Sequence, residues 1–236
     1  IVSIFVNPKQ FAPNEDFDSY PRTIDNDIKQ LKSLDVDLLF IPSIHDIYND
    51  ERIEIQYHNN MFSLLEGKTR PHFFKGVCSV VSRLFDIVNP TDAFFGEKDF
   101  QQFKIIEDMT QKLNYGINIV SCEIIREENG LAMSSRNEYL SSTNREKAKI
   151  IFELLKLGLK LINNGEKNVS NIYSNLTRKL SSESDISIDY IKIVRHSSLI
   201  EFENIIDDNF LICVAVYIQD IRLIDNIQYN YISSSI

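Results

Sequence analysis

The fold is decided by residues 92–102, which run Asp92-Ala93-Phe94-Phe95-Gly96-Glu97-Lys98-Asp99-Phe100-Gln101-Gln102. The apolar segment from Asp92 to Phe95 predicts a strand, and residues 100–113 predict the helix that follows it. A strand that passes through a short glycine turn into a helix is the building unit of a parallel α/β sheet. The stretch therefore indicates an α/β fold.

The same alternation extends outward from this stretch. We predict further strands at residues 1–6, 36–42 and 117–125, and helices at 23–34 and 73–89. The short unalternating apolar run at 1–6 is typical of a fully buried strand inside a parallel sheet. The pattern predicts a doubly wound parallel, Rossmann-like sheet. Because a buried strand needs neighbours on both sides, we expect the chain to begin inside a domain and to lack the first βα unit.

The pattern changes after the turn pair Asn129-Gly130. Helices are predicted at 144–163 and 169–181, and strands at 186–194, 210–217 and 222–224. Helices followed by strands indicate a small α+β domain. We therefore expect a Rossmann-like ligand-binding domain at 1–128, incomplete at its N-terminus, and a C-terminal α+β lid domain at 129–236.

The composition excludes several classes of protein. The 236 residues carry a formal net charge of −9, which disfavours nucleic acid and anionic lipid as partners. No apolar run approaches the roughly 20 residues that span a bilayer. The three cysteines form no CxxC pair and no metal-ligand spacing, which is typical of reduced thiols in the cytoplasm.

Three polar segments stand where ligands bind. The first is the turn at Gly96, where a strand ends and a helix begins, and where backbone N–H groups and Lys98 suit a phosphate. Asp99 suits a magnesium ion or a ribose hydroxyl. The alternative is an ordinary helix start with Asp99 as its N-cap.

The second segment is Met133-Ser134-Ser135-Arg136, which follows the turn at Gly130. Serine hydroxyls donate to phosphate oxygens, and arginine holds them with a planar pair of donors. The alternative is a serine N-cap on a short helix.

The third segment follows the strand at 1–6, where the amides of Asn7 and Gln10 suit a hydroxyl or carboxylate; a plain Asn-Pro turn is the alternative. A basic patch of Lys68, Arg70, His72 and Lys75 suits an anionic substrate or is a solvated loop.

Taken together, these segments resemble the pantoate–β-alanine ligase family. The match is carried by six stretches in the family's order, at residues 2–11, 20–23, 65–67, 95–102, 130–137 and 222–226. The resemblance implies a magnesium-dependent, cytoplasmic homodimer of the nucleotidyltransferase superfamily. It also implies that ATP and pantoate form pantoyl adenylate and pyrophosphate, and that β-alanine then displaces AMP to give pantothenate.

The resemblance also assigns residues. It places pantoate and β-alanine at Asn7, Gln10 and Gln102. It places ATP at Gly96, Glu97, Lys98, Asp99, Ile125, Met133, Ser134, Ser135 and Arg136. Catalysis would rest on Lys98, Ser134, Ser135 and Arg136, with no ligand assigned for the metal.

Two departures from the family pattern leave alternatives open. The family's Pro-Thr-Met-Gly-x-Leu-His-x-Gly-His segment is not in this sequence, and Phe73 stands where the family has histidine, with His72 one position early. A catalytically impaired remnant or dimer scaffold that retains nucleotide binding is one alternative. A related nucleotidyltransferase with another acceptor is the other.

Overall fold

The computed structural model describes residues 1–13, 15–48, 57–181, 183 and 185–229. The chain forms two compact units. Unit 1 comprises Ile1–Phe95 and Gln102–Val120, and unit 2 comprises Gly96–Gln101 and Ser121–Ile236. The short segment Gly96–Gln101 therefore packs with the C-terminal part of the chain, although it lies inside the N-terminal part of the sequence.

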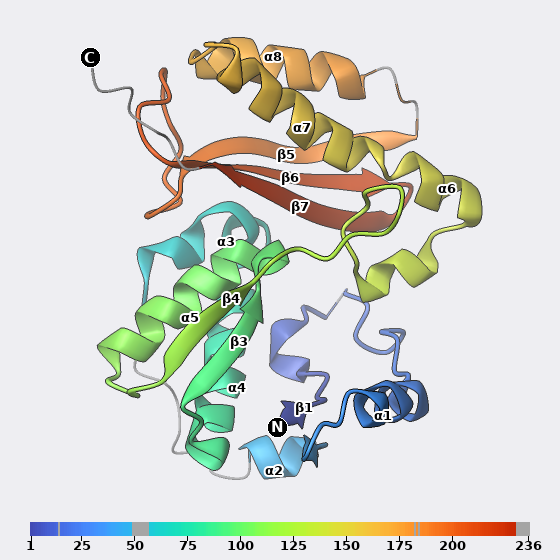
Figure 1. The fold of residues 1–236 in the computed structure, drawn as a ribbon, viewed down its shortest axis with the longest axis vertical. Coiled ribbons are helices and arrows are strands. Elements are labelled where there is room, and N and C mark those ends of the chain that lie inside the picture. The colour runs from blue at the N-terminus through green and yellow to red at the C-terminus, as the bar shows by residue number, and fades with distance from the viewer. Residues whose placement is uncertain (14, 49–56, 182, 184, 230–236) are drawn as a thin grey trace. The chain divides into compact units, whose positions relative to one another are not determined.

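Unit 1 alternates short strands with helices (Figure 1). Its strands are β1 (Val2–Ser3), β2 (Leu39–Phe40), β3 (Asp92–Gly96) and β4 (Asn118–Cys122). Its α-helices are α1 (Ile24–Ser33), α2 (Ile44–Tyr48), α3 (Leu65–Thr69), α4 (Phe73–Val88) and α5 (Phe100–Lys112), with 3₁₀ turns η1 (Pro8–Gln10) and η2 (Asn60–Ser63). Strand β1 pairs in parallel with β2, and β3 pairs with β4. The end residues of β3, α5 and β4 are shared with unit 2.

The helices α4 and α5 form where the sequence predicts them. One side of α4 carries apolar residues at helical spacing and is buried, with Phe74, Val77, Val81 and Phe85 among the buried residues. The helix ends at Asn89, whose backbone is left-handed with a φ of 46° and whose N–H donates to the Phe85 carbonyl. The buried face of α5 includes Ile105, Ile106 and Met109, all of which are fully buried.

The predictions for the first two strands were wrong in extent. Only Val2–Ser3 of residues 1–6 and Leu39–Phe40 of residues 36–42 are strand, and neither pair is fully buried. The apolar run at 1–6 predicts burial, but Asn7-Pro8 turns the chain into η1, and the Asn7 side chain caps that turn. The last ladder bond is that of the Ile4 N–H to the Phe40 carbonyl at 2.9 Å, so the pairing ends before this turn begins.

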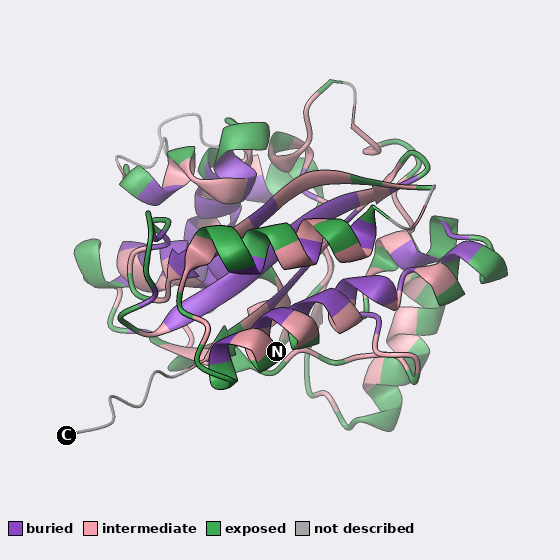
Figure 2. Ribbon diagram, turned by 90° about the horizontal axis from the view of Figure 1, so that it is seen from above, coloured by how far each residue is buried: buried purple, intermediate pink, exposed green. Residues whose placement is uncertain are grey.

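Unit 2 is built on a three-stranded antiparallel sheet in the order β5 (Ile186–Arg195), β6 (Phe210–Ile218) and β7 (Ile221–Tyr229). The helices α7 (Ile150–Asn163) and α8 (Val169–Leu180) cover one face of it (Figure 1). Strand β6 lies between the other two and is buried along nearly its whole length. Figure 2 shows the buried residues gathered along the strands and on one side of the helices that cross them.

Two predictions for unit 2 were wrong in their boundaries. The helix predicted at 144–163 is two helices, α6 (Ser142–Lys147) and α7, because the Ala148 and Lys149 N–H groups close a tight turn on Asn144 and Glu146. The strand predicted at 222–224 is the nine-residue β7, paired in register with β6 from Ile221 to Tyr229. The polar residues in its middle hide the strand from a pattern of hydrophobicity.

Among the residues that the structure describes, none of the helices has the length and apolar character needed to cross a membrane.

Candidate active site

Two of the three predicted amides of unit 1, Asn7 and Gln10, are bonded to each other, and the Asn7 side chain is only 3% exposed. Its Nδ2 donates to Gln10 Oε1 at 2.9 Å and to the Gly76 carbonyl at 3.1 Å. Its Oδ1 accepts from the Tyr48 hydroxyl at 2.7 Å and from the Lys9 N–H at 3.2 Å. Both donors and both acceptor positions of the amide are therefore in use within the chain.

These partners determine which way the amides point. The Gly76 carbonyl can only accept and the Lys9 N–H can only donate, so the Asn7 amide has one possible orientation. Because Asn7 presents a donor to Gln10, the Gln10 oxygen faces Asn7. The Gln10 Nε2 group is then the side of the amide that can donate to a ligand.

Arg70 holds the backbone of the same turn. Its Nη2 donates to the Gln10 carbonyl at 3.0 Å, and its guanidinium pairs with the Glu15 carboxylate at 2.5 Å and 2.7 Å. The guanidinium also lies 4.0 Å above the centre of the Phe73 ring. The charge of Arg70 is thus paired with Glu15 within the protein. Arg70 is therefore not available to an anionic ligand in the way predicted for the basic patch.

The one-residue shift between His72 and Phe73 places the two rings differently. His72 is exposed and precedes α4 without capping it through its side chain. Phe73 begins the helix and packs edge-on against Phe74 beneath Arg70. The His72 ring therefore does not lie at position 73, where the family pattern has its histidine. Gln102, the third predicted amide, is half-buried near the start of α5.

In unit 2, the first predicted phosphate segment forms a 3₁₀ turn, η3 (Glu97–Asp99), between β3 and α5. Gly96 is exposed and has an ordinary extended backbone (φ −72°, ψ 133°), and a Cβ placed there would meet nothing within 4 Å. The chain's own packing therefore does not require a glycine at this position. Asp99 is exposed, and its side chain caps no helix within the described residues. The alternative that Asp99 is the N-cap of α5 is therefore not realised.

The second phosphate segment is a loop closed by the Met133 N–H, which donates to the Ile125 carbonyl at 2.9 Å. The side chains of both residues are more than half exposed. The Ser134 hydroxyl accepts from the Arg136 N–H at 3.3 Å and begins the turn η4 (Ser135–Tyr139), so the capping alternative is realised. The hydroxyl keeps its own O–H donor, so capping does not prevent a bond to phosphate.

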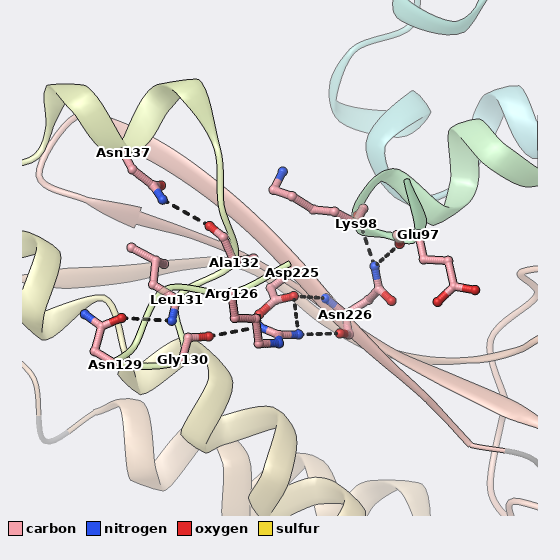
Figure 3. A network of polar contacts seen from close by, with 10 residues as sticks. All are labelled: Glu97, Lys98, Arg126, Asn129, Gly130, Leu131, Ala132, Asn137, Asp225 and Asn226. Atoms are coloured by element: carbon pink, nitrogen blue, oxygen red, sulfur yellow. Dashed lines mark hydrogen bonds and ion pairs between the residues drawn. The ribbon is translucent and has the colours of Figure 1, made fainter. Parts of the chain in front are cut away.

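A turn inside this loop depends on Gly130, whose φ is +94°. A side chain there would be strained and would collide with the Phe152 ring at 2.6 Å. Two asparagines support the turn (Figure 3). Asn129 Oδ1 accepts from the Leu131 N–H at 3.0 Å, and Asn137 Nδ2 donates to the Ala132 carbonyl at 3.0 Å.

Two adjacent residues of strand β7 contact the first phosphate segment and Arg126, which lies before the second phosphate segment (Figure 3). Asn226 Nδ2 donates to the carbonyls of Glu97 and Lys98 at 2.9 Å and 3.0 Å. Asp225 pairs with both terminal nitrogens of Arg126 at 2.6 Å and 3.0 Å. The structure thus brings the first segment and the start of the loop that leads to the second segment to one strand.

Charge within this network is balanced. Burial raises the pKa of Asp225 above its ordinary value, while the Arg126 guanidinium, and more weakly Lys98, favour the charged carboxylate. Among the described residues the Lys98 ammonium forms no ion pair of its own. Its charge can therefore serve an anionic ligand.

The comparisons with known proteins agree on one family. Residues 1–228 match the family model described as pantoate-beta-alanine ligase. The chain belongs to the pantoate-beta-alanine ligase family. The pantothenate synthetase of Clostridium acetobutylicum is 45% identical over 230 residues, which are 98% of this chain and 82% of that protein. The pantothenate synthetase of Pseudothermotoga lettingae is 42% identical over 226 residues, 96% of this chain and 80% of that protein.

Solved structures give the same answer for the fold. Pantothenate synthetase from Thermus thermophilus superposes with a TM-score of 0.90 at 36% identity, covering 96% of this chain and 82% of that one. A pantoate-beta-alanine ligase from Francisella tularensis, solved with β,γ ATP and β-alanine, gives 0.74 at 34% identity, covering 96% and 77%. The predicted α/β fold of the nucleotidyltransferase type with a C-terminal α+β part is confirmed, as is the family resemblance.

Sequence reasoning missed the residues that hold the site together. Arg126, Asp225 and Asn226 were assigned no role, and neither were Tyr48 and Gly76. Asp225 and Asn226 belong to a stretch that carries the family resemblance, and two adjacent polar residues in a strand paired over nine positions were the available signal. Tyr48 and Gly76 lie 41 and 69 residues from Asn7 and leave no such signal.

Proposed function

We propose that this protein uses ATP to join pantoate and β-alanine, forming pantothenate, AMP and pyrophosphate. The observation that carries the proposal is the family match over residues 1–228. All three polar segments fall within it: the one with the amides belongs to unit 1, and the two phosphate segments belong to unit 2. The bound ATP analogue and β-alanine in the Francisella tularensis ligase support the same substrates.

The reaction has two steps. A carboxylate oxygen of pantoate attacks the α-phosphorus of ATP, the bond from that phosphorus to the bridging oxygen breaks, and pyrophosphate leaves. The amine of β-alanine then attacks the acyl carbon, AMP leaves with the electron pair, and the nitrogen gives up a proton. Two anions meet in the first step, so positioning and charge neutralisation are the main contributions expected of the protein.

The amides of unit 1 are assigned to pantoate. Gln10 Nε2 is the donor that the Asn7 contacts leave available, so it suits a carboxylate or hydroxyl oxygen. Asn7 is buried and fully engaged, which supports a role in orienting Gln10 in place of direct contact with the substrate. Gln102 is the second amide assigned to pantoate.

The phosphate segments of unit 2 are assigned to ATP. Lys98 and Arg136 supply positive charge, and Ser134 and Ser135 supply hydroxyl donors. The open space at Gly96 leaves room for a nucleotide beside the backbone. The Ile125 backbone and the exposed Met133 line the same site, together with Glu97 and Asp99.

Magnesium fits the donor set as a companion of ATP. In the described residues no three His, Cys, Asp or Glu side chains gather as a metal-binding group. Mg²⁺ is commonly held by one or two carboxylates together with substrate phosphates, and the exposed carboxylate of Asp99 suits that arrangement. Bound there, the ion would neutralise phosphate charge.

The proposal is tested by mixing the protein with ATP, Mg²⁺ and pantoate and measuring pyrophosphate release. We expect release that depends on pantoate, and pantothenate once β-alanine is added. A reaction without pantoate is the control. ATP binding without pantoate-dependent release would favour the impaired scaffold, and release with a different acceptor would favour a related nucleotidyltransferase.

The remaining assignments stay predictions. A homodimer in the cytoplasm is expected from the family resemblance, and light scattering of the purified protein tests the dimer. The functional division into a nucleotide- and pantoate-binding domain at 1–128 and a lid at 129–236 is likewise a prediction. Nucleic acid and membranes are not proposed as partners.

A further inference from the structure

Two neighbouring residues of β7, Asp225 and Asn226, are polar and almost fully buried, at 4% and 5% exposure. Successive side chains of a strand point to opposite faces of the sheet. Ile221, Leu223 and Ile227 belong to the apolar core beneath α7 and α8, so Asp225 shares that face and Asn226 lies on the other. A buried polar pair in this position is costly unless its hydrogen bonds are satisfied.

On the core face, Asp225 fixes the loop that begins the second phosphate segment. Arg126 forms a two-pronged ion pair with it, and the same guanidinium donates to the Gly130 carbonyl at 3.1 Å. The guanidinium also lies 3.9 Å above the Phe152 ring of α7. Because the Arg126 guanidinium is held by the buried carboxylate and in turn holds the Gly130 carbonyl, the loop that leads to Met133–Arg136 starts from a determined place.

On the opposite face, Asn226 fixes the first phosphate segment. Its amide donates to two successive carbonyls, those of Glu97 and Lys98, and the neighbouring Gln228 donates to the Glu97 carboxylate at 2.8 Å. Figure 3 shows the Lys98 side chain extending away from this amide while its backbone is held. The contact therefore locates the base of Lys98 without neutralising its charge.

We infer that Asp225 and Asn226 together are a positioning element for ATP, holding the backbone of Lys98 and the Arg126 loop to the two faces of one strand. Neither residue is assigned a contact with substrate. The inference rests on the proposed function, because positioning is measured through ATP. The inference explains how two segments some 30 positions apart in sequence could act on one nucleotide.

The test is a double-mutant cycle between Asn226→Ala and Lys98→Ala, assayed by pantoate-dependent pyrophosphate release. We expect Asn226→Ala to raise KM for ATP and to lower kcat, by about tenfold or more in kcat/KM, since small misplacements of a charged group are costly. KM for pantoate should stay within about twofold. In the Lys98→Ala background the same change should cost less than about threefold, because the group being positioned is gone.

A second measurement separates positioning from folding. Asn226→Asp keeps the shape but turns an oxygen toward two carbonyls, so it should resemble Asn226→Ala in kcat/KM. Asn144→Ala is the matched control, since Asn144 is a buried amide of unit 2 that bonds to Gln219 at 2.9 Å. It should match Asn226→Ala in its loss of melting temperature while leaving KM for ATP unchanged.

The outcomes are distinct. Native kinetics for Asn226→Ala, a fully multiplicative loss with Lys98→Ala, or an equal rise in both KM values would overturn the inference. Calorimetric titration of each variant with magnesium ATP covers the case in which the native protein shows no turnover. A Kd for ATP weakened about tenfold by Asn226→Ala then supports positioning even though the proposed ligase reaction has failed, and an unchanged Kd refutes it.

Discussion

The polar groups of unit 1 and those of unit 2 are held in opposite ways. In unit 1 the polar side chains themselves are buried and joined, with the Asn7 amide bonded on every side to Gln10, Tyr48, Gly76 and the Lys9 backbone. In unit 2 Asn226 bonds to the backbone carbonyl of Lys98, and among the described residues the Lys98 ammonium forms no ion pair. The difference matches what each set of groups is proposed to bind.

An amide is directional, since it donates from one end and accepts at the other. Its use in recognition requires that the orientation be determined, and the network around Asn7 does that for Gln10. An ammonium is a compact charge with three rotatable donors, so it needs a fixed base and a flexible stem. The four predictions that follow test this contrast, starting with the largest expected effect.

Lys98→Ala should lower kcat by about 10²- to 10³-fold, because it removes charge stabilisation where negative charge develops on phosphate. The melting temperature should change little, since Lys98 forms no ion pair among the described residues. Steady-state kinetics and thermal unfolding measure the two effects. Lys160→Ala, which removes an exposed lysine of α7, is the control and should do neither. Equal losses of folding and activity would contradict a role for Lys98 at phosphate.

Asn7→Ala should affect both stability and pantoate binding. It removes the hydrogen bonds of Asn7 to the Gly76 carbonyl and to the Tyr48 hydroxyl, which keeps its hydrogen bond with Ser79, so each lost bond should cost about 0.5–1.5 kcal/mol in the free energy of unfolding. The Gln10 amide also loses its orientation, so KM for pantoate should rise about tenfold. Urea unfolding and kinetics measure these effects, and KM for ATP serves as the internal control. If KM for ATP rose as much as KM for pantoate, the Asn7 network would not act on pantoate alone.

Gly96→Ala should weaken ATP binding without weakening the fold. The added methyl meets no atom of the chain within 4 Å, and the backbone is one that alanine adopts readily, so the free energy of unfolding should stay within about 1 kcal/mol of the native value. We expect KM for ATP to rise several-fold. Gly76→Ala is the contrasting variant, because its Cβ would lie 2.2 Å from the Lys9 carbonyl oxygen and should reduce stability. An unchanged KM for ATP in Gly96→Ala would mean that the nucleotide does not approach this backbone.

The smallest expected effect concerns pH and the support of the second phosphate loop. A hydrogen bond from Arg145 lowers the pKa of Glu127 below its usual 4.5, and Asn137 lowers it further. A lowered pKa of an acid stabilises the folded state fully above the unfolded pKa, and this stabilisation is lost as the pH falls through the folded pKa. Glu127→Gln should therefore cost less than about 1 kcal/mol at neutral pH, because the pair is reached by solvent.

Unfolding in urea at several pH values from neutral to about 3 checks this prediction. The native protein should lose its advantage over Glu127→Gln below the usual pKa of glutamate. The same advantage at all pH values would show that Glu127 acts through shape and not through its charge.

The sequence was a good guide to local structure where local rules decide it. The helical spacing of apolar residues placed α4 and α8 within one residue of each end. The strand, turn and helix at 92–113 were predicted for the same reason, and the motifs identified the family. It was a poor guide to β7, whose length is decided by pairing with β6 and not by its own hydrophobic pattern.

By itself, the sequence determined the fold class, the family and the segments that carry polar chemistry, because these depend on residue type and order along the chain. Only the tertiary structure decided that Asn7 is fully engaged and orients Gln10, and that residues 96–101 pack with the C-terminal unit. It also decided that Asp225 bonds to Arg126, and Asn226 to the backbone of Glu97 and Lys98, from opposite faces of β7. Hydrogen bonds between residues some 40 to 130 positions apart depend on the completed fold, and no local pattern encodes them.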